Sequence, residues 1–365
     1  MRRGTFVLVI FVLIAAVIVG ISFFLRAQPA LETSISVSPM AEAWLRDAAA
    51  SFNASNPTVN GTQSVRVTVQ PLDEADIALG ESSRWAEQNH ADGWIPAAVF
   101  AIEFAQAQGL PMEMFVESVA QTSLVWGGFS SVVDQATDSG AQPFDWPAVN
   151  EAIASQPIRL AFRSPSSTID GFAVLLSGTA ALNESTAITR DSLRSPAARD
   201  WLENTLQAVP NTTTLGASAA QAMAARGPSV GGLALLPESE WLNNLRGQLV
   251  SASDPLQLAY PEFTVVFTFP CAAWSNPATQ DTSAGDRFKA VGAFCDFLLT
   301  PAQQANAVRF GLRPAGGILD PEAADMFMNA AQYGILLDPS LANVVEAPRR
   351  SDAQLLALAA SQIAP

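Results

Sequence analysis

Polar and apolar residues along this chain alternate first with the period of a strand and then with that of a helix. Residues 65–69 (VRVTV) carry an apolar side chain at every second position, as in a strand with one buried face. Residues 34–38 follow the same pattern, and Ser38-Pro39 then marks the start of a helix that we expect to reach Phe52. Similar patterns predict strands at 75–79, 124–126, 158–162, 231–236 and 263–269, and helices at 96–108, 168–178, 195–209, 286–299, 321–332 and 352–363. Strands that alternate with helices predict an α/β fold with a mostly parallel sheet.

A long apolar run near the N-terminus predicts a transmembrane helix. Residues 5–25 carry no charge, and a run of about 20 apolar residues matches the hydrocarbon core of a bilayer. Two arginines precede the run and one follows it, so the N-terminus is expected in the cytoplasm. We therefore expect 1–26 to be a signal-anchor of a single-pass cell-membrane protein and 27–33 a linker to an extracytoplasmic domain. A long cleaved signal peptide is the alternative, and it exports the same domain.

Composition and motifs argue against several functional classes. The formal net charge is −15, which is unfavourable for binding nucleic acid or an anionic lipid surface. His90 is the only histidine, and the chain contains no G-x-S-x-G elbow, P-loop or G-x-G-x-x-G motif. One histidine and two distant cysteines do not form a typical zinc site. We therefore expect no enzyme, metal or cofactor, and a hydrolase acting through His90 is a weak third hypothesis.

Cys271 and Cys295 are the two cysteines of the chain. Outside the cytoplasm, an even number of cysteines permits a disulfide. Such a bridge would close a loop of about 25 residues, worth roughly 3 kcal/mol in the chain-entropy model. Two buried free thiols are the alternative, because sequence alone does not define the geometry.

The junctions between strands and helices are the candidate ligand-binding positions. In parallel α/β sheets, ligands lie beyond the carboxyl ends of the strands, where helix N-termini point outward. Hydroxyl and carboxyl side chains occupy four of these junctions: Ser38, Ser82, Ser83, Ser166, Ser167, Thr168 and Glu238.

Each junction also has a purely structural interpretation. Free N–H groups and hydroxyls at 166–168 suit an anion or a polar oxygen, but Ser167-x-x-Asp170 also fits a capping box. Glu238 suits a cation or an amine, or only the first turn of a helix. Arg163 follows a predicted strand, where it can pair with an anionic ligand or form a structural ion pair.

Four stretches resemble a known class of proteins: 36–53 (SVSPMAEAWLRDAAASFN), 75–98, 159–172 (RLAFRSPSSTIDGF), and 260–270 continuing into 286–314. In this order they resemble type II periplasmic solute-binding proteins. The similarity is strongest to the binding-protein-like domain often found beside a von Willebrand factor A domain. Ser164 and Ile169-Asp170 depart from that pattern, which usually has aspartate at the first position and a small residue and serine at the others.

The resemblance implies two lobes with a ligand in the cleft between them. We expect lobe one at 34–120 plus 262–345, lobe two at 121–261 and a C-terminal helix at 346–365. The implied function is a membrane-anchored protein that captures a small polar solute, anions included, for an ABC-type importer and its permease. The alternative is an interaction or sensor module at the cell surface without a transport role.

Overall fold

The computed structural model describes residues 10–17, 29–79, 85, 90–209, 215–275 and 283–363. Residues 10–17 are helical, and no helix within these ranges is long and apolar enough to cross a membrane. Most of the predicted anchor at 5–25 lies outside the described residues, as do Ser82 and Ser83.

The first sheet has the strand order β2-β3-β1-β4-β11-β5. Its strands are β1 (Leu31–Val37), β2 (Thr58–Val59), β3 (Gln63–Pro71), β4 (Gly93–Ile95), β5 (Met112–Val116) and β11 (Cys271–Trp274). β1 is parallel to both β3 and β4, whereas β2 is antiparallel to β3 and β11 is antiparallel to its two neighbours. The helices associated with this sheet are α2 (Glu42–Ala54), α3 (Ala75–Ala78), α4 (Val99–Ala107), α12 (Ala284–Leu298) and α13 (Pro301–Arg309).

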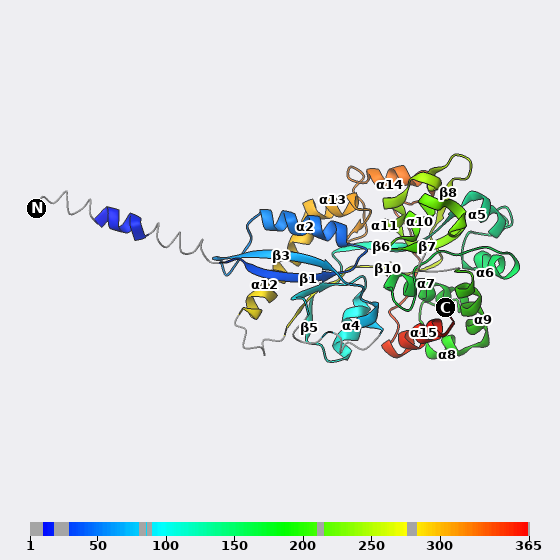
Figure 1. Ribbon diagram of the computed structural model, residues 1–365, viewed down its shortest axis with the longest axis horizontal. Coiled ribbons are helices and arrows are strands. Elements are labelled where there is room, and N and C mark those ends of the chain that lie inside the picture. The colour runs from blue at the N-terminus through cyan, green and yellow to red at the C-terminus, as the bar shows by residue number, and fades with distance from the viewer. Residues whose placement is uncertain are drawn as a thin grey trace, which may run out of the picture.

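The core of this half forms where α2 and α12 pack on the sheet (Figure 1). Phe52 of α2 meets Phe294 of α12 edge to face, with ring centroids 5.4 Å apart. A disulfide joins Cys271 on β11 to Cys295 on α12, and their Cα atoms are 6.1 Å apart. The sequence did not distinguish a disulfide from two free thiols, and the structure has the disulfide, which attaches α12 to the sheet.

The second sheet is built around the long strand β6 (Ala120–Phe129). Its other strands are β7 (Leu233–Pro237), β8 (Leu256–Ala259), β10 (Val266–Phe267) and β12 (Arg313–Pro314). All four pair antiparallel with β6. Because antiparallel pairings also outnumber parallel ones in the first sheet, the expectation of a mostly parallel sheet is wrong. The expected strand at 158–162 makes only one bridge, Leu160 to Leu233, which is parallel.

Helices surround the second sheet, and the two sheets lie side by side along the long axis of the molecule (Figure 1). These helices are α5 (Ser130–Ala136), α6 (Trp146–Ser155), α7 (Ile169–Leu182), α8 (Arg190–Arg194), α9 (Pro196–Gln207), α10 (Ala219–Arg226) and α11 (Glu238–Asn244). Trp146 of α6 lies between Trp126 and Trp201, with ring centroids 4.9 and 5.6 Å away, and anchors β6 to α6 and α9. The chain passes between the sheets at 117–119, 268–270 and 310–312.

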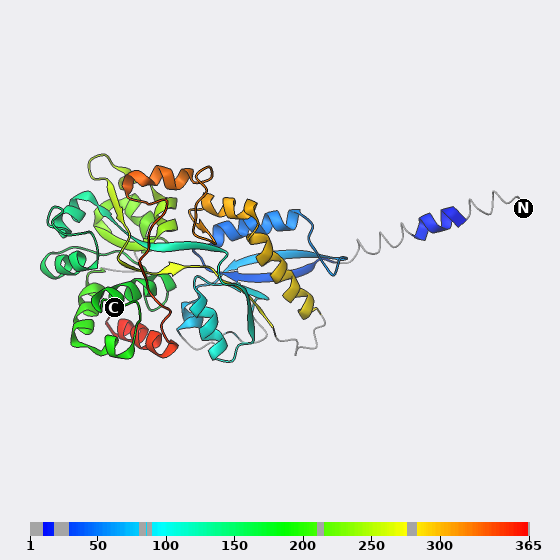
Figure 2. The same cartoon turned by 180° about the vertical axis from the view of Figure 1, so that it is seen from behind.

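The C-terminal segment runs back along the second half (Figure 2). It contains α14 (Asp325–Ala330), β13 (Asn343–Val344) and α15 (Arg350–Ile363). β13 is parallel to β9 (Phe263–Thr264), and α15 packs against α8 and α9. α15 covers the helix expected at 352–363.

One predicted strand, 75–79, is the short helix α3. Ala75 and Ala78 are buried, and the N–H groups of Ala78 and Leu79 donate to Glu74 and Ala75 in a helical turn. A short apolar run fits a strand and one turn of helix equally well, so its period alone does not distinguish them.

Candidate functional site

The carboxyl ends of β1, β3 and β4 lie together at one edge of the first sheet. Val37 at the end of β1 is in register with Pro71 and Ile95. The Ser38 N–H donates to the Ile95 carbonyl over 2.8 Å, so the serine is held directly beyond β1. Ser38 is fully buried, and its Oγ has no hydrogen-bond partner among the described residues. Ser38 therefore lies at the predicted strand end, but it is not open to solvent, and its predicted contact with a ligand stays a prediction.

Glu74 follows β3 at the same edge and is fully buried. Its Oε1 accepts a 2.7 Å hydrogen bond from the Ala97 N–H, whereas Oε2 has no partner within the described part of the chain. Burial raises the pKa of this carboxyl from 4.5 to about 8, and the nearby Asp73 and Asp170 raise the pKa further. Around neutral pH Glu74 is thus mostly a neutral acid with one unused oxygen.

Arg163 links the two halves of the molecule at this place. Its Nε donates to Asp170 Oδ2 over 2.8 Å, and its Nη2 also bonds the other oxygen of Asp170. Its Nη1 lies 4.0 Å from Oδ2 of Asp73, which belongs to the first half. Burial alone lowers the pKa of Arg163, but the Asp170 charge outweighs burial and raises it, so the guanidinium stays charged. The sequence allowed Arg163 either to pair with an anionic ligand or to form a structural ion pair, and in the structure it forms an ion pair with Asp170.

The start of α7 is fixed by Thr168 rather than by Ser167. Thr168 Oγ1 accepts from the Gly171 N–H at 3.3 Å and donates to the Ser164 carbonyl at 3.0 Å. A Cβ at position 171 would collide with the carbonyl oxygen of Arg163, so glycine permits this close approach. The predicted Ser167–Asp170 capping box is wrong, because Thr168 is the cap and Asp170 binds Arg163.

Ser166 and Ser167 are exposed beside this helix start. The Oγ atoms of Ser166 and Ser164 are 3.1 Å apart, within hydrogen-bond distance. These hydroxyls are therefore accessible, unlike Ser38 and Glu74.

Glu240 on α11 is a further carboxyl group whose charge acts on Arg163, as do the charges of Asp170 and Asp73. We call these three residues and Glu74, on which Asp73 and Asp170 act, the inter-lobe acid cluster. Glu240 Oε1 accepts from Ser218 Oγ at 2.8 Å and from the Ala220 N–H at 3.0 Å. Burial and the Asp170 charge raise its pKa, while those two hydrogen bonds and Arg163 oppose the rise. Arg163 thus pairs directly with Asp170, and Asp73 lies 4.0 Å from its guanidinium.

Sequence reasoning missed three members of this cluster. Asp73 and Glu74 come shortly after β3, which contains the alternating residues 65–69 and ends at Pro71. The incorrectly predicted strand at 75–79 concealed this junction. Glu240 lies two residues after the chosen Glu238, and nothing in the local pattern distinguishes the two.

Glu238 lies apart from the cluster in a different ion pair. It is fully buried, and its two oxygens accept 2.7 Å hydrogen bonds from Arg313 Nε and Nη2. Tyr260 Oη also donates to this carboxylate, and burial together with the Glu238 charge raises the pKa of the phenol. Glu238 is therefore occupied by groups of this chain and is not available to a ligand in this structure.

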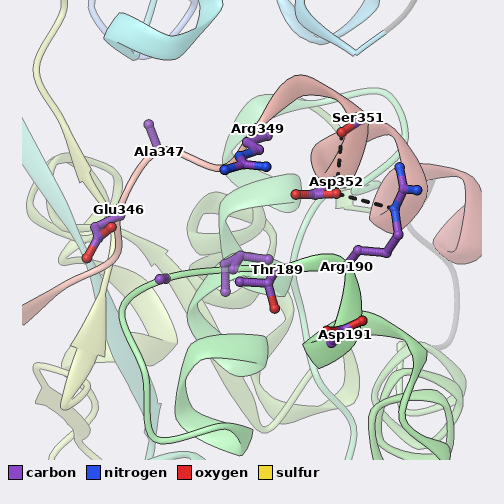
Figure 3. Close-up of a pocket in the computed structure, with 10 residues that line it drawn as sticks. Thr189, Arg190, Asp191, Glu346, Ala347, Arg349, Ser351 and Asp352 are labelled. Carbon is purple, nitrogen blue, oxygen red and sulfur yellow. Dashed lines mark hydrogen bonds and ion pairs between the residues drawn. The ribbon is translucent and has the colours of Figure 1, made fainter.

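A separate cavity of about 630 Å³ lies between residues 187–191 and 346–352 (Figure 3). Two of its charged groups pair with each other: Asp352 Oδ1 is 3.8 Å from Arg190 Nε, and it also accepts from Ser351 Oγ at 3.4 Å. None of the residues singled out from the sequence lines it. Within the described ranges, no group of three or more histidine, cysteine or acidic residues is arranged to hold a metal ion.

Comparisons with known proteins give the fold. No family model matches the sequence, and no curated protein sequence matches it. The maltose-bound MalE3 of T. maritima is similar with a TM-score of 0.56 at 14% identity, over 92% of this chain and 95% of that one. A Streptococcus pneumoniae solute-binding protein in complex with the blood group A-trisaccharide gives 0.55 at 13% identity, over 91% and 95%. AfuA from Actinobacillus pleuropneumoniae, with exogenous fructose-6-phosphate bound, gives 0.53 at 14% identity, over 80% and 87%.

At such low identity the similarity establishes the fold alone. This chain has a mixed α/β fold of two domains, as the solved solute-binding proteins do, so the predicted fold class is confirmed at that level. Two of these structural neighbours are described as a solute-binding protein and a periplasmic binding protein.

Proposed function

We propose that this protein is an extracytoplasmic solute-binding protein that captures a small polar ligand between its two lobes. The observation that carries this proposal is the meeting of Asp73 from the first half with Arg163 and Asp170 from the second. Charged groups that face one another from two domains can contact a ligand bound between those domains. Closure of two lobes around a ligand is the established motion of such folds.

The lobes in this proposal follow the two sheets. The sequence predicts 34–120 plus 262–345 for the first lobe and 121–261 for the second, and we propose one change to these bounds. We assign residues 313–345 to the second lobe, and the support is that β12 pairs with β6 and β13 with β9. The C-terminal helix at 346–365 then also belongs with the second lobe, since α15 contacts α8 and α9.

Hydroxyl groups supply the neutral part of the proposed site. Ser166 and Ser167 are exposed next to Arg163 in sequence, and Ser38 stands at the facing edge of the first sheet. Thr168 contributes by fixing the helix start. Ser82 and Ser83 remain predicted contacts outside the described residues.

The cellular location and the partner of the protein in this proposal are taken from the sequence. The segment at 1–26 would tether the domain to the membrane, and a tether raises the effective concentration of the domain near an ABC permease. The similarity to the domain found beside von Willebrand factor A domains rests on the sequence motifs and stays a prediction.

Thermal unfolding of the full-length chain in mild detergent tests the proposal. A panel of sugars, amino acids, amines and inorganic anions is added one at a time, and a ligand that binds only the folded state raises the unfolding free energy, by about 2.7 kcal/mol at 100 times its Kd. Small-angle scattering with the best ligand should show a smaller radius of gyration as the lobes close. A panel that leaves both measurements unchanged contradicts transport binding.

The alternative is a binding-protein-like interaction or sensor module. The observation in its favour is that Asp170 stands where the resembled pattern has serine and already neutralises Arg163. If no small molecule in the panel shifts unfolding, this alternative gains support.

A further inference from the structure

A cavity of about 490 Å³ lies in the second half of the molecule, where the C-terminal helix α15 packs against α8 and α9 (Figure 1). Its volume is within the range of about 300–1,000 Å³ that is usual for small-molecule sites. None of its lining residues belongs to the inter-lobe acid cluster or to the cavity at 187–191 and 346–352. It is therefore a separate candidate site.

The walls of this cavity are mostly apolar. Leu355, Ala359 and Ile363 follow one another at a spacing of four residues on α15, so they form a row along one face of that helix. All three are half-buried, so α8 and α9 leave part of this apolar row uncovered. The side chains that line the cavity from α8 and α9 include Leu193, Trp201 and Leu202. An apolar group of a ligand would remove this surface from water, and that removal favours binding.

The charged residues that line the cavity are arginines. Arg194, at the end of α8, and Arg199, in the first turn of α9, both line it, and no acidic residue among the described ones does so. Both side chains are exposed, and neither forms an ion pair within the described part of the chain. The whole chain has a formal net charge of −15, so the sign of the charge at this cavity is opposite to that of the protein.

The position of Arg199 does not help its own helix. The N-terminus of a helix carries a partial positive charge, so a cation in the first turn is unfavourable there. α9 has no acidic residue in that turn, and Ala198, next to Arg199, also lines the cavity. Asp200 and Glu203 of α9 are exposed but do not line it. Two guanidinium groups and the positive end of α9 thus lie together at an apolar cavity.

We propose that this cavity binds a free carboxylic acid of medium chain length, with its tail between α15 and α9 and its carboxylate at Arg194 and Arg199. A guanidinium offers a carboxylate two parallel hydrogen bonds, and the apolar walls accept the tail. The cavity has room for one such chain but not for both tails of a phospholipid, so the free acid is the occupant. This inference goes beyond the proposed solute-binding function, because the two sites share no residue.

Matched solutes separate the contribution of the tail from that of the head group. Isothermal titration of the full-length chain in phosphatidylcholine nanodiscs, with empty nanodiscs as the blank, compares octanoate with octanol and with acetate. Nanodiscs replace detergent, because detergent would compete for an apolar cavity. We expect octanoate to bind at least about tenfold more tightly than either. From butanoate upward, the affinity should rise by up to about fourfold for each added methylene until the cavity is full.

Two variants locate the site. Arg194→Gln/Arg199→Gln removes both charges at exposed positions, so the fold should tolerate it, and the affinity for octanoate should fall at least about tenfold. Ala359→Phe fills the space beside α15 and should abolish binding. Arg66→Gln, at an exposed position of β3 in the first half, is the control and should leave the affinity unchanged. If Ala359→Phe does not fold, the double arginine variant still decides.

The inference is overturned if octanol binds as tightly as octanoate, if the double arginine variant keeps its affinity, or if no acid of the series binds. A folded Ala359→Phe variant that still binds octanoate also contradicts it, because the acid then binds elsewhere. These outcomes do not bear on the proposed solute-binding function, which is tested with the panel of small polar solutes. A panel without a ligand leaves this site standing in turn.

Discussion

Arg313 and Glu238 form a buried ion pair with two hydrogen bonds of 2.7 Å each. Their side chains are 5% and 0% exposed, and the guanidinium also donates to the carbonyls of Leu336 and Leu337. The pair therefore fastens the C-terminal segment to the junction of β7 and α11. Arg313 belongs to a Gly-Leu-Arg-Pro stretch whose arginine we interpret as structural.

Breaking this pair should strongly destabilise the protein. Arg313→Met leaves Glu238 buried without its counter-charge, and loss of one partner of a buried pair costs about 3–5 kcal/mol. Urea unfolding followed by circular dichroism measures the loss. Arg309→Met, at an exposed position on α13, is the control and should cost little. Equal stability of the two variants would show that the pair is dispensable.

Glu74 should make stability depend on pH in a defined direction. Its pKa rises from 4.5 to about 8 on folding, so between these values the folded state binds more protons than the unfolded state. Stability contributed by this group is complete below pH 4.5 and falls as pH rises toward 8, with a slope of up to about 1.4 kcal/mol per unit.

Urea unfolding of the ligand-free chain across this pH range measures that slope. Glu74→Gln should flatten it, and Glu113→Gln, a change at an exposed position of β5, should preserve it. An unchanged slope in Glu74→Gln would mean that other groups cause the dependence.

Thr168→Ala and Ser167→Ala should separate capping from binding. Thr168 caps α7, so its loss should cost about 1 kcal/mol of stability. Ser167 is exposed and does not cap α7, so Ser167→Ala should leave stability unchanged and weaken ligand binding. Thermal unfolding and titration with the best ligand of the panel measure the two effects. Equal ligand affinity in Ser167→Ala would remove this residue from the site.

Reduction of the disulfide should loosen the attachment of α12. Cys271 and Cys295 are 24 residues apart, so the bridge restricts the unfolded chain by roughly 3 kcal/mol. Unfolding with and without a thiol reductant measures this, and a Cys271→Ala/Cys295→Ala variant, insensitive to the reductant, is the control. A midpoint that the reductant does not move in the parent chain would contradict the prediction.

The sequence predicted local structure well where one face of an element is buried. Residues 65–69 alternate because β3 is half-buried, and the helix at 168–178 begins at Thr168 because a hydroxyl caps it. The prediction from sequence failed at 75–79, where four residues form a helical turn instead of a strand. It also failed in the second sheet, where β6 pairs antiparallel with strands that are distant in sequence. Strand direction depends on partners that local periodicity does not identify.

The sequence by itself therefore determined the α/β class, the apolar N-terminal run, the two cysteines and the helix start at Thr168, whereas the helix expected from Ser38-Pro39 begins only at Glu42. These features follow from side-chain period, charge and capping, which act within a few residues. Only the tertiary structure decided the partners of the charged groups. Glu238 pairs with Arg313, and Asp73 lies beside the Arg163–Asp170 pair, because folding brings together segments as far apart as residues 73 and 163, and burial forces their charges to pair or to take up protons.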